Sequence, residues 1–550
     1  MENILQQLDE LYSQGLYEEG YQFLLEQMKK AMQENNDVII LGLLSELMGY
    51  YRVRGQFEMG NQMAQNAVAI LHKMGIEESV SAATTYLNIA TLKKVAHEYD
   101  QASFYFEKCQ KIYAEQLTPN DVRYIALLNN MSIFYHELNQ GQKAIELALT
   151  ALQGIMQIPD GQIETAISYS NIAAMYFDME EIDQAKYCIE EATKLFEQYG
   201  PSDPHYISVT ALQAQYELKY QHFNKAIELF ELAREKIVAI YGENRDFEIM
   251  TNNIQLVKEK MEFTPTIQAC HKLYQEKLLP LIKKECPEAL PFLAIGLLGF
   301  GSQCLGYDDE VSKDHDFSED VCIWIPRVNY LQYGKKLETI YEKVAVHRNI
   351  SHHGQGRVGV LIIEDFIAGF IGQMPETQNQ FFTLQESNLK ALTSGYIFED
   401  NLGKMTEIID QLRFYPRDVR LTKLANQVAL MAQSGQYNYY RCLNRLDDLA
   451  LFQIKATFIE ATIQTIHLLN NVYCPFYKWS SRSLKALPKL NEVHQLLEKI
   501  MISNNQDVKI LIENICNLVL VELKKQGLSQ GDDDFLENHV QNILSKRGKI

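Results

Sequence analysis

Residues 301–317, GSQCLGYDDEVSKDHDF, combine two features that could do chemistry on a phosphate. Gly301 and Ser302 come first, and Asp314 and Asp316 follow after eleven intervening residues. Glycine lets backbone N–H groups approach an anion closely, and the serine hydroxyl adds a further donor. On a strand, residues 314 and 316 share one face, and two carboxylates on one face suit Mg²⁺. The segment therefore predicts a metal and triphosphate site for an in-line displacement.

A small set of secondary-structure elements must position this segment. Residues 292–298 read as a buried strand that ends just before the Gly-Ser pair, and residues 316–325 read as a second strand. Residues 330–346 favour a helix, and residues 357–363, RVGVLII, read as a third strand. Together they predict a mixed α/β module over residues 291–383.

The order of strand, Gly-Ser, eleven residues and Asp-x-Asp resembles the polymerase-β-like nucleotidyltransferase superfamily. Two later stretches extend the likeness: TSGYIFEDNLGKMTEIIDQLRFYPRDV at 393–419 and NNVYCPFYKW at 470–479. In this order the three motifs look like a bacterial family of unknown function with a nucleotidyltransferase core. The resemblance covers roughly residues 290–500.

The resemblance implies roles for particular residues. Gly301 and Ser302 would hold the triphosphate of ATP or another NTP, and Asp314 and Asp316 would bind Mg²⁺. Lys478 resembles the basic residue that a helical C-terminal domain contributes to the phosphates. The same motifs contain three residues whose roles stay open: Asp400, Arg413 and Tyr415.

Members that activate an acceptor hydroxyl usually bring a third carboxylate from a later strand. Glu364 is favoured as that metal ligand and base, because strand alternation would give it the face of Val360 and Ile362. Asp365 is the alternative. If neither reaches the metal, nucleotide binding could survive without transfer.

The first 262 residues repeat with a period near 40. Small residues after a turn recur at intervals of 40, 42, 42, 41 and 41, at Gly20, Gly60, Ala102, Ala144, Ala185 and Ala226. This period predicts two helices per unit, and the pattern resembles tetratricopeptide repeats. In a second register lie Asn88, Asn130 and Asn171, which either join helix pairs or form a ladder of amides that grips a partner's backbone.

Charge and cysteine content limit the classes of partner. The net charge is −20; residues 263–550 carry 31 Lys and Arg against 33 Asp and Glu, so −18 belongs to residues 1–262. Neither half has the basic excess expected for nucleic-acid binding, and the acidic repeats favour a basic peptide or protein. Nine widely spaced cysteines without a CxxC pair indicate a reduced, cytoplasmic protein. No secretory signal is evident, and the longest apolar run, 289–301, is too short to span a bilayer.

These patterns predict a mostly α multidomain protein. We expect a tetratricopeptide-like solenoid at 1–262, a linker helix at 263–290, the nucleotidyltransferase core at 291–383 and a helical domain at 384–550 that completes the nucleotide cleft. The favoured function is Mg²⁺-dependent transfer of a nucleoside monophosphate, with AMP from ATP favoured, to an acceptor hydroxyl. The solenoid would recruit a protein partner or the acceptor. The alternatives are a catalytically weak nucleotide-binding regulatory or scaffold protein, and a small-molecule adenylylating enzyme, for which so large a solenoid is less natural.

Overall fold

The structure is a computed structural model of a mostly helical chain, which forms two compact units. The first unit comprises residues 1–178 and 183–209, and the second comprises residues 179–182 and 210–550. The described residues are 1–13, 16–241, 245–261, 264–307, 319–345, 358–445 and 447–548. The domain boundaries expected at 262, 290 and 383 remain predictions.

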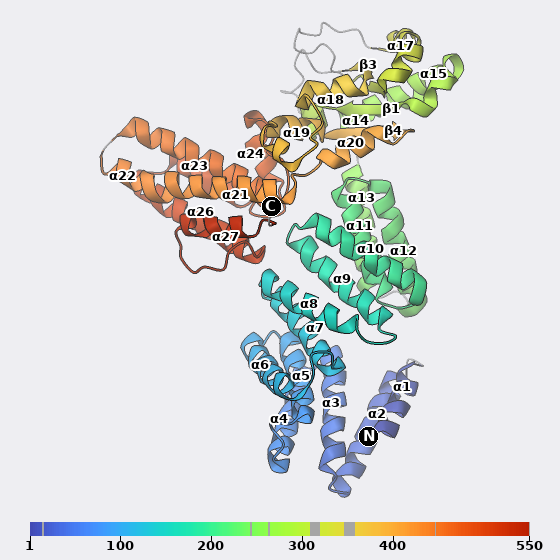
Figure 1. The fold of residues 1–550 in the computed structure, drawn as a ribbon, viewed down its shortest axis with the longest axis vertical. Coiled ribbons are helices and arrows are strands. Elements are labelled where there is room, and N and C mark those ends of the chain that lie inside the picture. The colour runs from blue at the N-terminus through green and yellow to red at the C-terminus, as the bar shows by residue number, and fades with distance from the viewer. Residues whose placement is uncertain are drawn as a thin grey trace. The chain divides into compact units, whose positions relative to one another are not determined.

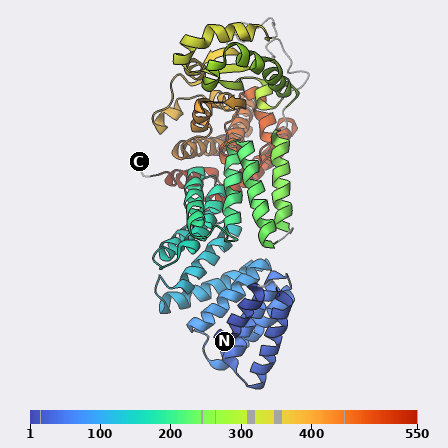
Figure 2. The ribbon, with the colours of Figure 1, turned by 90° about the vertical axis from the view of Figure 1, so that its right-hand side faces the viewer.

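The first unit is a solenoid of antiparallel helix pairs, as the repeat predicts (Figure 2). Its helices are α1 (Glu2–Ser13), α2 (Tyr17–Gln33), α3 (Asp37–Val53), α4 (Phe57–Met74), α5 (Val80–Val95), α6 (Tyr99–Gln116), α7 (Val122–Glu137), α8 (Gly141–Ile155), α9 (Gln162–Asp178) and α10 (Ile182–Tyr199). Every repeated small residue is buried where two helices approach, including the last one, Ala226, in the second unit. A larger side chain at these positions would push the paired helices apart.

The helical array continues into the second unit. Its next helices are α11 (Tyr206–Lys219), which begins in the first unit, α12 (Phe223–Tyr241) and α13 (Arg245–Met261). The predicted linker helix is present as α14 (Pro265–Leu273), a π-helical turn at Tyr274–Leu278 and α15 (Leu279–Glu285). The Thr264 hydroxyl caps its start by accepting from the Ile267 N–H, and it ends at Cys286, before Pro287, as predicted.

A four-stranded mixed sheet lies at the centre of the α/β module, in the order β3-β2-β1-β4. Its strands are β1 (Ala294–Leu298), β2 (Cys322–Ile325), β3 (Gly359–Ile362) and β4 (Gly395–Asp400). β1 pairs antiparallel with β2 and β4, whereas β2 and β3 run parallel. The central strands β1 and β2 are fully buried, which explains their continuous apolar runs.

The expected strands are shorter than predicted, and one was missed. A 3-10 helix at Pro287–Phe292 occupies the start of the predicted first strand. β4 falls in the stretch predicted to be helical from residue 384, and that prediction is wrong at 395–400 because pairing with β1 overrides the local pattern. Gly395 has a φ of +109°, and a Cβ there would lie 2.1 Å from the Leu297 carbonyl oxygen, so only glycine fits this pairing.

Five helices of 4 to 16 residues pack around the sheet (Figure 1). They are α16 (Ser302–Leu305), α17 (Arg327–Glu342), α18 (Ile363–Ile371), α19 (Glu386–Leu392) and α20 (Lys404–Leu412). α17 and α18 pack on β3, α14 on β1 and α20 on β4. The sheet and these helices share one apolar core with the helices that follow.

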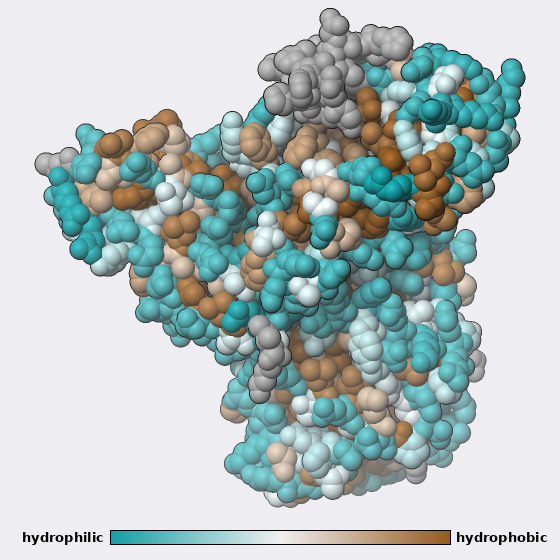
Figure 3. All heavy atoms as spheres, turned by 45° about the horizontal axis from the view of Figure 1, so that its top comes forward, coloured by the Kyte–Doolittle hydropathy of each residue, from teal (hydrophilic) through white to brown (hydrophobic). Residues whose placement is uncertain are grey.

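The rest of the second unit is helical. It contains α21 (Arg417–Met431), α22 (Tyr439–Leu443), α23 (Asp448–Leu469), α24 (Tyr477–Lys485), α25 (Val493–Ile502), α26 (Asn505–Lys525) and α27 (Val540–Ser545). Its surface is mostly hydrophilic, with scattered apolar patches over the arm that holds α22 and α23 (Figure 3). Among the described residues, none of the helices combines the length and apolarity that crossing a bilayer needs.

Candidate functional site

The Gly-Ser turn lies directly after the buried strand β1, where the sequence predicts it. Gly299 has a φ of +125°, which turns the chain out of the strand, and α16 begins at Ser302. The Tyr307 N–H donates to the Ser302 carbonyl at 2.8 Å and closes this short segment. A strand, a glycine-rich turn and a helix start therefore follow one another within ten residues.

Helix α24 packs on the same segment from the C-terminal helical region. The Trp479 ring lies 5.4 Å from the Tyr307 ring, and the Arg482 guanidinium donates to the Tyr307 carbonyl at 3.3 Å. Lys478 is exposed, with its Nζ 5.1 Å from the centre of the Trp479 ring. The fold thus brings the helix of Lys478 next to the Gly-Ser turn, although the two are far apart in sequence.

Helix α19 approaches the turn from another side. The Asn388 amide donates to the Phe370 carbonyl at 2.8 Å, and the Phe370 ring stacks on Phe300 at 5.1 Å. After α19 the chain enters β4 at Gly395, which pairs with Leu298 at the end of β1. α19, α24 and the Gly-Ser turn therefore share one end of the sheet, which we call the Gly-Ser end.

The structure describes only one of the three predicted metal ligands, Glu364. Asp314 and Asp316 lie outside the described residues, so their role stays a prediction. Glu364 is not on a strand, because β3 ends at Ile362 and Glu364 lies in the first turn of α18. The strand-alternation reasoning for Glu364 is therefore wrong.

The strand register places Glu364 and Asp365 away from the Gly-Ser turn. β3 and β2 run parallel and finish together, with Ile325 opposite Ile362, and Trp324 pairs with Ala294 at the start of β1. The Gly-Ser turn follows the other end of β1. The register does not bring Glu364 together with Ser302.

Glu364 and Asp365 are each already held by a cation. Glu364 accepts from Lys404 Nζ at 2.6 Å and from the Arg327 N–H at 3.0 Å, and Asp365 pairs with the Arg327 guanidinium. Burial raises the pKa of Glu364, but the Lys404 hydrogen bond and backbone donors outweigh it and hold that pKa below the usual value. Within the described part of the chain, no group of three His, Cys, Asp or Glu could hold a metal ion.

The structure reveals cations at the Gly-Ser end that sequence reasoning did not select. Lys390 lies half-buried on α19, and within the described residues its amine has no hydrogen bond or ion pair. Burial, and then the neighbouring Arg413 charge, lower the pKa of Lys390. The sequence cannot show that a helical lysine has no hydrogen bond or ion pair, because its possible partners come from elements distant in sequence.

Arg413, whose role was open, is close enough to Lys390 for its charge to lower the lysine's pKa, and Tyr415 follows it by two residues. The Tyr473 hydroxyl donates to the Leu412 carbonyl at 2.8 Å and fixes the chain ahead of Arg413. Arg413 Nε reaches Asp410 only at 3.5 Å and has no hydrogen bond within the described residues. The buried Tyr415 hydroxyl also has no hydrogen-bond partner in the described structure.

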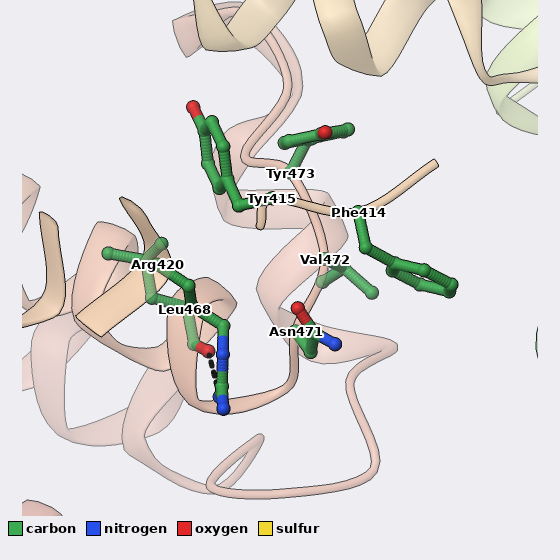
Figure 4. Close-up of a pocket in the computed structure, with 7 residues that line it drawn as sticks. All are labelled: Phe414, Tyr415, Arg420, Leu468, Asn471, Val472 and Tyr473. Carbon is green, nitrogen blue, oxygen red and sulfur yellow. Dashed lines mark hydrogen bonds between the residues drawn. The ribbon is translucent and has the colours of Figure 1, made fainter. Parts of the chain in front are cut away.

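Tyr415 also lines a narrow crevice, which contains a buried arginine, Arg420 (Figure 4). It is lined by Phe414, Tyr415, Arg420, Leu468, Asn471, Val472 and Tyr473. Its arginine, Arg420, is fully buried and donates to the Leu468 and Glu180 carbonyls, each at 3.4 Å, with Glu181 at 3.8 Å. Arg420 therefore has hydrogen-bond acceptors as well as a carboxylate, whereas among the described residues Arg413 Nε has only the carboxylate of Asp410 and the Lys390 amine has neither.

Comparison with known proteins identifies two stretches. Residues 164–236 match a tetratricopeptide repeat model, which supports the solenoid prediction. Residues 381–480, which contain α19, Arg413, Tyr415 and Lys478, match a domain of unknown function, DUF4037. No curated protein matches the chain.

Solved structures resemble the chain only remotely. BtubC from P. vanneervenii is 19% identical over 36% of this chain and 80% of its own, with a TM-score of 0.33. The apo quorum sensor NprR from B. thuringiensis is 15% identical over 51% of this chain and 75% of its own, with a TM-score of 0.37. The apo form of RapI is 11% identical over 74% of this chain and 97% of its own, with a TM-score of 0.39.

Proposed function

We propose that the second unit is a Mg²⁺-dependent nucleotidyltransferase that moves a nucleoside monophosphate, AMP from ATP in the first instance, to an acceptor hydroxyl. The observation that carries the proposal is the Gly-Ser turn after buried β1, with α24 and its exposed Lys478 packed beside it. Backbone N–H groups, a hydroxyl and a lysine are donors suited to a triphosphate.

We assign the metal to Asp314 and Asp316, on the sequence spacing alone. Mg²⁺ held by these carboxylates would neutralise charge on the phosphates during displacement of pyrophosphate. The chain's own part is to hold the triphosphate through Gly301, Ser302 and Lys478. The proposed site does not include Glu364 as the third carboxylate, because the strand register places it at the other end of the sheet.

The test is label transfer from α-labelled ATP with Mg²⁺ and cell lysate as the acceptor source, with parallel arms using the other NTPs. We expect a labelled product with the wild-type chain and at least roughly a hundredfold less with Asp314→Asn/Asp316→Asn. Lys485→Ala, on an exposed face of α24, is the matched control. Transfer that persists undiminished in the double variant would remove the active-site assignment.

A second proposed function is recruitment of a protein or peptide by the solenoid, the regulatory or scaffold alternative. It is supported by the tetratricopeptide match and by Asn88, Asn130 and Asn171, which are half-exposed on α5, α7 and α9. The Asn130 amide donates to the Ala126 carbonyl of its own helix at 2.9 Å, which still leaves an amide hydrogen and an oxygen for a ligand.

Binding of fluorescent basic and acidic peptides to the full chain tests this second function. The acidity of residues 1–262 predicts tighter binding of basic peptides, weakened about tenfold by replacing the three asparagines with alanine. Equal affinity for both peptide classes would argue against charge-guided recruitment.

A further inference from the structure

The Gly-Ser end contains polar donors that lack acceptors. The Lys390 amine and the Tyr415 hydroxyl have no hydrogen-bond acceptor among the described residues, and Arg413 Nε has only the ion pair with Asp410 at 3.5 Å. Arg413 and Tyr415 lie on the segment between α20 and α21, and Lys390 lies on α19. A buried donor without an acceptor costs free energy, and a poorly compensated buried cation costs more.

The two carboxylates nearby do not compensate the lysine. Glu386 Oε1 accepts the Cys474 N–H at 2.9 Å, and burial raises the pKa of Glu386. Asp410 lies at 3.5 Å from Arg413 Nε and is shared with His222, at 3.1 Å. An excess of positive charge therefore remains around Lys390 and Arg413.

The remaining titratable groups around Lys390 do not supply a negative charge either. His467 is buried and its pKa is lowered to about 4, chiefly by burial, so it is neutral at pH 7. Burial raises the pKa of Cys474 far above its usual value, so its thiol is protonated. The Arg413 guanidinium adds a second positive charge that lowers the pKa of Lys390 further.

This cluster lies at the end of the sheet that carries the Gly-Ser turn. Two residues before Lys390, Asn388 ties α19 to Phe370, and Phe370 stacks on Phe300 next to Gly301. Five residues after Lys390, Gly395 pairs with Leu298. On the other side, Cys474 bonds Glu386 and leads into α24, which covers Tyr307.

We propose that Lys390, Arg413 and Tyr415 bind phosphate oxygens of the nucleotide held at the Gly-Ser turn. The inference rests on the proposed nucleotide site and names residues beyond it. Phosphate presents several charged acceptor oxygens, which match the Lys390 amine, the neighbouring Arg413 guanidinium and the Tyr415 hydroxyl two residues beyond it. An anion would also offset the repulsion between Lys390 and Arg413.

Isothermal titration of the full chain with pyrophosphate, without nucleotide, tests the proposal. We expect Lys390→Met and Arg413→Met each to weaken pyrophosphate binding by about tenfold or more, and Tyr415→Phe by roughly two- to fivefold. Lys423→Met is the control, because Lys423 lies nearby over the Tyr415 ring, at 5.0 Å from its centre, but outside the proposed set. Thermal unfolding of each variant checks that it is folded.

The pH profile separates binding from a structural role. Since burial holds the pKa of Lys390 low, wild-type affinity should fall as pH rises from about 7 to 9.5, relative to Lys390→Arg, whose guanidinium stays charged. Parallel profiles in the two proteins would overturn the assignment of Lys390, even if Lys390→Met cannot be folded.

Competition experiments with two other ligands identify the chemistry that the site binds. MgATP should compete with pyrophosphate, and citrate should not; preference for citrate would show a carboxylate site and overturn the phosphate assignment. No pyrophosphate binding at millimolar concentration would also overturn it. Pyrophosphate binding without label transfer would instead leave this site intact and remove only the transferase activity.

Discussion

The two ends of the four-stranded sheet differ in how their charges are compensated. At the Glu364 end each carboxylate has a partner: Glu364 has Lys404, Asp365 has Arg327, and Asp400 accepts the Thr406 N–H at 2.7 Å. At the Gly-Ser end, Lys390 and Lys478 have no carboxylate within the described structure.

Compensation distinguishes a structural role from a binding role. Paired charges at the end of a sheet hold the starts of helices in place and need no ligand. Unpaired cations are instead stabilised when an anion binds next to them. A site built for phosphate would look like the Gly-Ser end. Sequence reasoning did not distinguish paired from unpaired charges, which only the contacts in the structure show.

The most disruptive test alters the Gly-Ser end itself. Gly395→Val should lower the free energy of unfolding by about 3 kcal/mol or more, because the residue has a positive φ and its Cβ would meet the Leu297 carbonyl oxygen. Urea unfolding measures this, and Gly369→Ala, with open space around it in α18, is the control that should change stability by less than about 1 kcal/mol. Equal effects of the two changes would mean that the β1–β4 pairing is not needed there.

Lys478→Ala should weaken MgATP binding about tenfold, or about 1.4 kcal/mol, and make the affinity less dependent on salt. The physical reason is loss of an exposed cation beside the Gly-Ser turn. Lys404→Ala removes a cation at the opposite end and should leave the affinity unchanged. A larger loss from Lys404→Ala would reverse the comparison between the two ends.

His222 sharpens the comparison because it shares Asp410 with Arg413. Hydrogen bonds to Asp410 and then Glu217, at 2.7 Å, raise the pKa of His222 to about 9. Since this pKa lies above the value of about 6.5 for an unfolded chain, the stabilisation is fully present below about pH 6.5 and is lost as pH rises through about 9. We expect about 1 kcal/mol, allowing for solvent screening of a partly exposed group.

Unfolding in urea at a series of pH values from about 6 to 10 measures this loss, and His222→Gln should remove it. His205, which pairs with Asp203 on an exposed loop, offers a matched variant, His205→Gln, that should leave the pH dependence in place. A wild-type chain whose stability is flat between the unfolded and folded pKa values would show that His222 is not charged.

The smallest effect is expected at the compensated end. Glu364→Gln should cost less than about 1 kcal/mol, because the pair with Lys404 is partly exposed to solvent, which screens it. Label transfer should be unchanged, since Glu364 lies at the opposite end of the sheet from Ser302. A loss of transfer of about a hundredfold in a folded Glu364→Gln protein would restore the sequence-based role of this carboxylate.

The sequence by itself determined the helical repeat and the Gly-Ser turn. Small residues at intervals of about 40 are needed wherever paired helices touch, so the period is visible without a structure, and all six are buried. Apolar residues followed by Gly299 and Gly301 likewise predicted a strand that ends in a turn, because that signal is local.

Only the tertiary structure decided which charged residues meet. β4 exists because residues 395–400 pair with β1 across about a hundred positions, and no local pattern encodes that partner. The β1–β4 pairing places α19, which precedes β4 and contains Lys390, at the Gly-Ser end of the sheet. The parallel β2–β3 register places Glu364 at the opposite end. Whether a charge is compensated depends on neighbours that are distant in sequence, so the sequence alone cannot show that Glu364 is paired with Lys404 or that the Lys390 amine has no partner among the described residues.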